Sequence, residues 1–240
     1  MNIDLAIDLS DTRNQLHWAA QLLSAAADAT LEKAADDSHS NLGWDADKQQ
    51  MVGRGGCSIA VADFLLISGS ESFSLSEQTL ADAGNWLGDV LESKIVFRDY
   101  EMPPHAVQTG AAFNPDSSHL KSICSWLSFA ENAMADFPGI RIWPHHFDMG
   151  FWISGEIEGR SIGGGFSLGD SHYNQPYFYI NPYGVERPSQ LPELSFGHWT
   201  ENWFGAVLNA EELKNSPSDL AGTAKEFIDS TVQICRQLTS

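Results

Sequence analysis

The sequence predicts an α+β fold with a mostly antiparallel sheet and four main helices. Three observations predict it: four stretches with apolar residues at helical spacing, strand-like runs between them, and an order of helix, strands and helix that occurs twice. The chain has 240 residues, of which 42% are hydrophobic and 11% aromatic, so it can bury a substantial core. We expect a single compact unit over residues 1–240.

The four helices are expected where capping residues precede an apolar stripe. The first follows Ser10 and Asp11, the second begins near Ser76, the third follows Asp116 and Ser117, and the fourth follows Ser216-Pro217. Their stripes are Leu16, Ala20, Leu23 and Ala27; Leu80, Ala83, Leu87 and Val90; Leu120, Ile123, Leu127, Ala130 and Met134; and Ala224, Phe227, Thr231, Ile234 and Leu238.

The strands are expected between these helices. Residues 57–68 are nearly all apolar or β-branched, which is typical of a central strand, and residues 70–76 are its expected hairpin partner. Residues 140–156 form the longest candidate, with a bend near Pro144. Further strands are expected at residues 160–168, 177–181 and 203–208.

The repeated order of elements suggests two halves, residues 1–98 and 117–240, with residues 99–116 as the expected connection. In each half the first helix leads to a segment that contains histidine, Ser-His-Ser-Asn at 38–41 and Pro-His-His-Phe at 144–147. The pattern fits an internal duplication, or two unrelated α+β stretches that share one sheet.

The composition is strongly acidic, since 32 Asp and Glu against 13 Lys and Arg give a formal net charge of −19. A field of that sign repels nucleic-acid phosphates and anionic lipid head groups, and no Lys/Arg cluster offsets it locally. We therefore expect no nucleic-acid partner and no membrane partner. A neutral or cationic small molecule fits this charge, and the oligomeric state is left open.

The three cysteines, Cys57, Cys124 and Cys235, are widely spaced and form no C-x-x-C motif. This favours reduced, buried thiols over disulfides or a thiolate zinc site. The N-terminal residues lack the basic and apolar regions of a secretory signal. The most apolar run, residues 59–67, is shorter than the roughly 20 residues of a membrane helix. We therefore expect a cytoplasmic location.

The motif Trp-Pro-His-His-Phe-Asp at 143–148 is the most informative segment. If one strand continues through it, alternation places His145 on an apolar face, as a core histidine. His146 then shares the opposite face with Asp148, Gly150 and Trp152. That face combines an imidazole, a carboxylate, a gap and an aromatic ring, as the wall of a ligand pocket does.

The pairing of Asp and His two positions apart recurs as Asp-Ser-His at 37–39 and 170–172. Such pairs project in the same direction on a strand, so they can share a metal ion or a proton-transfer role. The hypothesis is that His146, Asp148 and His172 form the catalytic or metal-binding set. In it Asp170 orients His172, His198 is a further ligand, and the metal is a divalent ion such as zinc. The alternative is that the pairs only tie loops together.

Residues 165–169 read Gly-Phe-Ser-Leu-Gly, a formal G-x-S-x-G motif around Ser167. A nucleophile elbow needs a helix after the serine, and the following Asp-Ser-His-Tyr-Asn-Gln-Pro does not start one. A phosphate loop is also disfavoured because no Lys follows and no helix N-terminus receives the anion. We expect the glycines at 163–165 to form a flexible loop or bulge beside the pocket.

Aromatic residues alternate along the strand expected at 177–181, with Phe178 and Ile180 pointing inward. Aromatic faces beside carboxylates can hold sugars or cationic ligands, although ordinary sheet packing is the alternative. The expected ligand-pocket residues are Trp152, Asp170, Tyr177, Tyr179 and His198.

Four runs of the chain, residues 36–42, 143–148, 176–179 and 204–208, resemble a bacterial family of uncharacterised proteins, a domain of unknown function. The resemblance covers nearly the whole chain, and its middle runs are the more specific. It implies one complete unit and brings no activity, cofactor or catalytic residue. The glycine run at 163–165 departs from the family's pattern.

Two functions from different classes fit the sequence. The first is a metal-dependent or acid–base enzyme, a hydrolase or lyase acting on a small polar substrate. The second is a non-catalytic protein that binds a small ligand or is purely structural, in which the His/Asp pairs hold loops. The two differ in whether His146 and His172 face each other across one cleft.

Overall fold

The computed structural model describes residues 3, 5, 8–216 and 219–240. It confirms the α+β class, with antiparallel strands and the four main helices expected. These helices are α1 (Ser10–Thr30), α2 (Leu80–Leu91), α3 (Ser117–Ala133) and α5 (Leu220–Thr239), and a short α4 (Ala210–Lys214) precedes α5.

Internal contacts divide the chain into two compact units. Unit 1 comprises Leu9–Ser128 and Arg141–Phe147, and unit 2 comprises Phe129–Ile140, Asp148–Ser240 and the described residues ahead of Leu9. The division falls inside α3, whose last turns belong to unit 2. That the chain is one unit built from two related halves stays a prediction.

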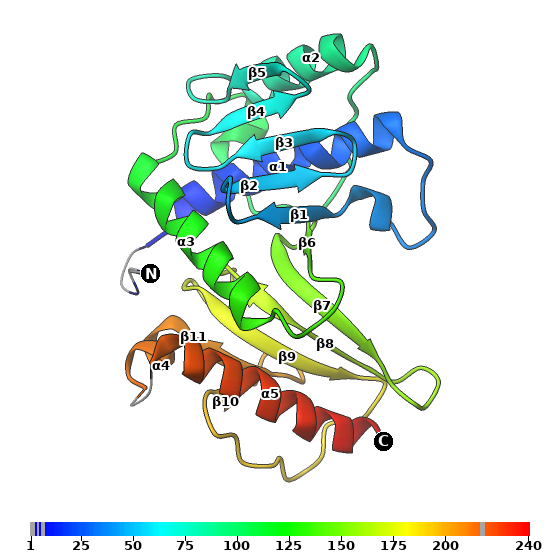
Figure 1. The fold of residues 1–240 in the computed structure, drawn as a ribbon, viewed down its shortest axis with the longest axis vertical. Helices are drawn as coiled ribbons and strands as arrows, with labels where there is room; N and C mark the ends of the chain where they lie inside the picture. The colour runs from blue at the N-terminus through cyan, green and yellow to red at the C-terminus, as the bar shows by residue number, and fades with distance from the viewer. Residues whose placement is uncertain (1–2, 4, 6–7, 217–218) are drawn as a thin grey trace. The chain divides into compact units, whose positions relative to one another are not determined.

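Unit 1 is an antiparallel meander packed on helices (Figure 1). Its strands are β1 (Leu42–Asp45), β2 (Gln50–Gly53), β3 (Cys57–Ala60), β4 (Leu65–Ser68), β5 (Glu71–Ser74) and β6 (Arg141–Trp143), in the order β6-β1-β2-β3-β4-β5. Helix α1 packs against β2, β3 and α2. It is buried along most of its length and on more than one side, and its many alanines allow close approach.

The strand predicted at residues 57–68 is in fact two strands, β3 and β4, joined by a tight turn. The turn ends at Phe64, whose backbone is left-handed with φ of +51°. Val61 and Phe64 are apolar and buried within this turn, so Asp63 alone marks the turn in the sequence.

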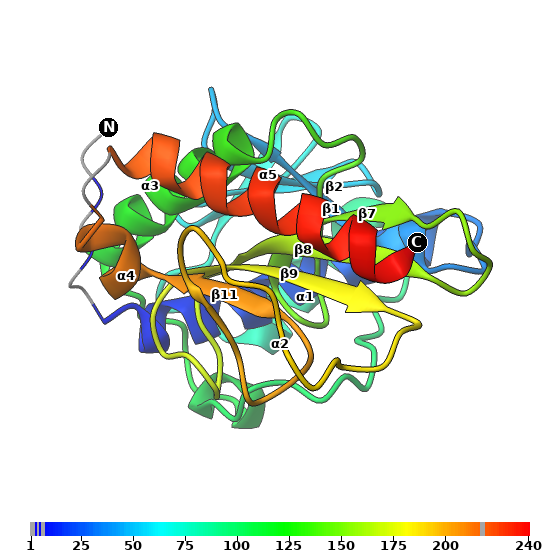
Figure 2. The same cartoon turned by 90° about the horizontal axis from the view of Figure 1, so that it is seen from below.

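Unit 2 has a five-stranded antiparallel sheet with α5 across β8 and β9 (Figure 2). Its strands are β7 (Asp148–Ser154), β8 (Ser161–Ser167), β9 (Tyr177–Tyr183), β10 (His198–Trp199) and β11 (Ala206–Asn209), in the order β10-β11-β9-β8-β7. Asp219 caps α5, since its Oδ1 accepts a hydrogen bond from the Gly222 amide at 2.9 Å. The predicted start at Ser216-Pro217 includes Pro217, which lies outside the described residues.

Two further predictions are corrected, one for a strand and one for a loop. The strand expected at 140–156 is interrupted by a turn at residues 144–147, where Phe147 has φ of +58° and donates its amide to the Trp143 carbonyl at 2.7 Å. His146 therefore lies in a turn and does not alternate with Asp148. The glycines at 163–165, expected in a loop or bulge, lie in the middle of strand β8.

Candidate functional site

The sheet of unit 2 has one apolar side and one polar, aromatic side. Met149, Phe166, Phe178 and Ile180 are buried on the apolar side. Alternation and strand register place the opposite side chains together: Asp148 and Trp152 from β7, and Tyr177, Tyr179, Asn181 and Tyr183 from β9. We call these six residues the aromatic face. Four of them, Asp148, Trp152, Tyr177 and Tyr179, were predicted as site residues.

Tyr179 reaches across β8 and donates its hydroxyl hydrogen to Oδ2 of Asp148 on β7. The glycines of the neighbouring strands make this reach possible. A Cβ at Gly165 would lie 2.6 Å from the Tyr179 hydroxyl, and one at Gly150 would lie 3.2 Å from it. Burial, and then the charge of Asp148, raise the pKa of Tyr179 well above its ordinary value, so the hydroxyl remains a donor.

Tyr177 makes a second tyrosine–carboxylate pair, with its hydroxyl 2.5 Å from Oδ2 of Asp170. Burial, followed by the Asp170 charge, raises the pKa of Tyr177. The other oxygen of Asp170 accepts hydrogen bonds from the backbone amides of His172 and Tyr173 at 2.7 and 2.9 Å. The Asp170 carboxylate therefore holds its own loop, and this differs from the predicted role of orienting the His172 ring.

The His172 side chain packs against Trp203, with ring centroids 5.7 Å apart. His198 makes stronger polar contacts: its Nδ1 lies 2.8 Å from Oε1 of Glu212, and its Nε2 lies 3.0 Å from the Tyr173 hydroxyl. Tyr173 and Glu212 were not singled out in the sequence. They lie 25 and 14 positions from His198, and no short motif links residues at such separations.

The exposed end of the aromatic face is formed by Trp152 and Tyr183, which stack with ring centroids 5.0 Å apart. The two rings meet above Gly163, where a Cβ would lie 2.8 Å from the Tyr183 ring. Asn181 links this pair to Trp203, because its Nδ2 donates to the Tyr183 hydroxyl at 3.2 Å and its Oδ1 accepts from Trp203 Nε1 at 2.9 Å. These contacts connect five side chains in a row, which we call the belt: Trp152, Tyr183, Asn181, Trp203 and His172.

His146, the third member of the predicted metal set, belongs to unit 1, whereas Asp148 and His172 belong to unit 2. Among the described residues, no three His, Cys, Asp or Glu side chains gather in a way that could hold a metal ion. His146 is exposed, and its ring lies 4.2 Å from that of His145. Burial, and then proximity to His146, lower the pKa of the half-buried His145.

The turn that carries these two histidines is held from α1. His17 Nε2 and Gln21 Nε2 lie 2.8 and 2.7 Å from the Pro144 carbonyl oxygen, and the His17 ring stacks on Phe147 at 4.8 Å. The burial of His17 lowers its pKa to about 4, so it is a neutral donor to the turn.

The side chains of Asp37 and His39 hold the loop after α1 in place within unit 1. Nδ1 of His39 accepts from the Ala34 amide at 3.1 Å, which leaves Nε2–H to donate to Asp28 at 2.9 Å. Arg98 binds both oxygens of Asp28 at 2.6 Å and reaches Asp37 at 2.9 Å. The hydrogen bond from Arg98, and then that from His39, lower the pKa of Asp28 to about 2. The loop is thereby fastened to α1.

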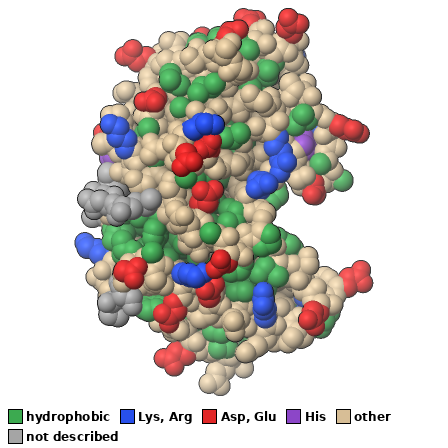
Figure 3. Space-filling model, in the orientation of Figure 1, with side chains coloured by type: hydrophobic (Ala, Val, Ile, Leu, Met, Phe, Trp, Pro, Cys, Tyr) green, Lys and Arg blue, Asp and Glu red, His purple; other side chains and the backbone are tan. Residues whose placement is uncertain are grey.

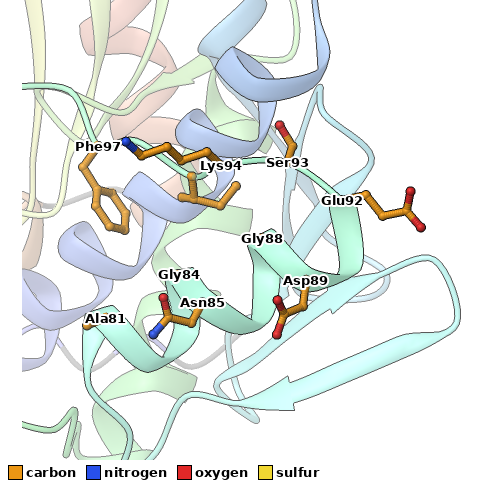
Figure 4. A pocket seen from close by; sticks show the side chains of 10 residues that line it. Ala81, Gly84, Asn85, Gly88, Asp89, Glu92, Ser93, Lys94 and Phe97 are labelled. Carbon is orange, nitrogen blue, oxygen red and sulfur yellow. The ribbon is translucent and has the colours of Figure 1, made fainter.

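A surface depression of about 950 Å³ lies on α2 in unit 1, between the helix and residues 92–97 (Figure 4). Its floor is a stripe of small residues that includes Gly84 and Gly88. A Cβ at Gly84 would lie 3.5 Å from the Phe97 ring, and one at Gly88 would lie 3.0 Å from the Ser93 carbonyl oxygen. The small residues of the stripe therefore allow residues 92–97 to pack closely against helix α2.

No family model matches the chain, and neither does any curated protein or solved structure. The resemblance to an uncharacterised bacterial family therefore stays a prediction. Among the described residues, no helix has the length and apolar character needed to span a bilayer.

Proposed function

We propose that the aromatic face of unit 2 binds a small polar ligand that carries no negative charge. The observation that supports this most strongly is the stacked pair Trp152–Tyr183. Large aromatic side chains are usually buried, yet Trp152 is 57% exposed and Tyr183 is 42% exposed. Two adjacent exposed rings offer a flat apolar surface for one face of a sugar ring or for a cationic head group.

Polar groups lie where such a ligand would need them. The Asn181 amide and the Tyr183 hydroxyl are joined at 3.2 Å beside the rings, and both are less than fully buried. A few placed hydrogen-bonding groups next to aromatic surface are the usual composition of a small-ligand site. The Tyr179–Asp148 pair lies further along the same face and adds a carboxylate whose charge favours a cation.

The charge of the chain bears on the ligand class. Acidic side chains are spread over the visible surface of both units, with single Lys and Arg side chains among them (Figure 3). With a formal net charge of −19, the surrounding field repels anions. Neutral polyols and amines are therefore the favoured classes.

The binding hypothesis is favoured over the metal enzyme because members of two of the three predicted His/Asp pairs hold loops. Asp170 binds the amides of its own loop, and His39 fastens residues 34–39 to Asp28. Acid–base catalysis remains a second candidate, which the contacts of His198 with Tyr173 and Glu212 favour.

The test is a titration of protein labelled with ¹⁵N at the tryptophan indoles, using choline and N-acetylglucosamine as probes. We expect one of the two to shift the indole signals of Trp152 and Trp203. A titration up to about 10 mM detects binding free energies as weak as about −3 kcal/mol. Trp86, which stacks on Phe73 in unit 1, serves as the internal control and should not move.

The matched variant is Trp152→Ala, which should abolish the shift at Trp203. Its melting temperature should stay near that of the parent, because the side chain is more than half exposed. If neither probe moves the Trp152 signal, or if Trp86 moves equally, the aromatic face is not a binding site for these ligand classes.

A further inference from the structure

Three side chains from separate segments of unit 2 meet at the edge of the belt described above. Tyr173 comes from the loop between β8 and β9, His198 from β10, and Glu212 from α4. The contacts run in one line, from Glu212 to His198 Nδ1 at 2.8 Å and from His198 Nε2 to the Tyr173 hydroxyl at 3.0 Å. The side chains of His198 and Glu212 are 40% and 33% exposed, so solvent and small molecules reach them.

Glu212 is fixed from its own helix. Its Oε2 accepts from the Asn209 amide at 3.0 Å, and its amide donates to Asn209 Oδ1 at 2.9 Å, which together form a capping box. The remaining oxygen is thus held toward His198. A carboxylate at Nδ1 keeps the hydrogen on that nitrogen and leaves the Nε2 lone pair facing Tyr173.

The Tyr173 hydroxyl has a second polar neighbour, Oγ1 of the buried Thr200, at 2.9 Å. Its single hydrogen therefore has two acceptors. If that hydrogen moves to Nε2 of His198, the resulting phenolate oxygen can accept hydrogen bonds from Nε2–H and from the Thr200 hydroxyl. The Tyr173 ring is held in place by Tyr177 and Trp203, with centroids 5.1 and 5.9 Å away. The surroundings therefore fit both forms of the side chain.

We propose that Tyr173, His198 and Glu212 form a nucleophile, a general base and an orienting carboxylate, and that Tyr173 takes up an acyl group from small activated acyl donors. A nucleophile bonded to a base that is itself oriented by a third group is the arrangement of acyl-transfer sites on unrelated folds. The proposal deepens the proposed function, since it places a reactive group at the edge of the aromatic face.

The step can be written for N-acetylimidazole as the acyl donor. The phenol oxygen of Tyr173 bonds to the carbonyl carbon while its proton passes to Nε2 of His198. The carbon–nitrogen bond of the donor then breaks, and imidazole leaves with that proton. Water, deprotonated by His198, next attacks the acetyl ester, and acetic acid departs as Tyr173 recovers the proton that His198 held. No oxidation or reduction occurs, and His198 and Glu212 end unchanged.

The experiment measures acetylation and its loss at each tyrosine by peptide mass spectrometry after brief exposure of the folded protein to N-acetylimidazole. Tyr183 is the control within the same molecule, because it is 42% exposed and lies on the same unit. We expect Tyr173 to react at least about 10-fold faster than Tyr183, since general-base assistance contributes roughly 10² to 10⁴. We also expect the acetyl group to leave Tyr173 faster than it leaves Tyr183.

Two variants separate catalysis from packing. His198→Gln should bring the Tyr173 rate down to that of Tyr183 or below, and Glu212→Gln should lower it about 10-fold, with the Tyr183 rate unchanged in both. Wild-type protein alone decides the matter if a variant fails to fold, because equal rates at Tyr173 and Tyr183 overturn the proposal. An undiminished Tyr173 rate in folded His198→Gln does so too. Neither result affects the choline and N-acetylglucosamine titration, so the two proposals fail separately.

Discussion

At the scale of single residues, we expect the buried imidazole of His17 to contribute to the acid sensitivity of unit 1. It is 4% exposed, and burial lowers its pKa from the ordinary 6.5 to about 4. The unfolded chain therefore binds a proton between these values that the folded protein does not. Stability is fully present above pH 6.5 and is lost as the pH falls toward 4, by on the order of 3 kcal/mol.

The measurement is urea unfolding between pH 7.5 and 5 for the parent and for His17→Gln. In the variant, the free energy of unfolding should lose the part of its pH dependence that is due to His17. The variant should also be less stable at pH 7.5, because the stacking on Phe147 is gone. Parallel profiles for the parent and His17→Gln would show that His17 does not carry the effect.

Individual residues also show what could be predicted from sequence. Tyr177 and Tyr179 were predicted to share one face of their strand, and the strand register agrees, because alternation on a strand is a local property. That they and Asp148 and Asp170 form a site stays a prediction. Their partners could not be predicted, since the Tyr179–Asp148 pair spans two strands and depends on the register with β8. Glu212 was missed because it follows Asn209 by three positions, a spacing that indicates only a helix cap. Glu212 does take part in that cap, and it also contacts His198.

At the scale of elements, strand β8 determines the shape of the aromatic face. Its glycines lie in register with Trp152 and Tyr179 rather than in a loop. The glycines at 163–165 were predicted to form a flexible loop or bulge. The side chains that require glycine there belong to β7 and β9, so the local sequence does not reveal them. Helices were predicted well for the opposite reason, since their apolar stripes are spaced within one segment.

We expect Gly165→Ala to destabilise the protein by about 1 to 3 kcal/mol through overpacking. The new Cβ would lie 2.5 Å from the Met149 carbonyl oxygen and 2.6 Å from the Tyr179 hydroxyl, and neither can withdraw without disturbing the sheet. The matched control is Gly43→Ala in β1, where the nearest atom is 3.9 Å away. Urea unfolding should show little change for the control, and equal losses in the two variants would contradict this account of the glycines.

At the scale of the whole molecule, the net charge is the dominant electrostatic property. The 32 acidic side chains outnumber the 13 basic ones, and several of the basic ones are already in ion pairs, as Arg98 is with Asp28 and Lys225 with Asp136. Repulsion among the remaining carboxylates opposes the compact state, and dissolved salt screens it. Composition alone predicts this property, because it depends on the number of charges more than on their positions.

We therefore expect the melting temperature to rise by several degrees as NaCl is increased from about 20 mM to about 0.5 M at pH 7.5. Reversing Glu71, Glu101 and Glu193 to lysine tests the cause, because all three are exposed and each reversal adds two positive units, taking the formal charge from −19 to −13. The triple variant should melt higher than the parent at low salt and gain less from added NaCl. Sucrose, which stabilises compact states without screening charge, should raise both proteins equally. If the parent and the triple variant respond to NaCl by the same amount, the salt effect arises from something other than charge repulsion.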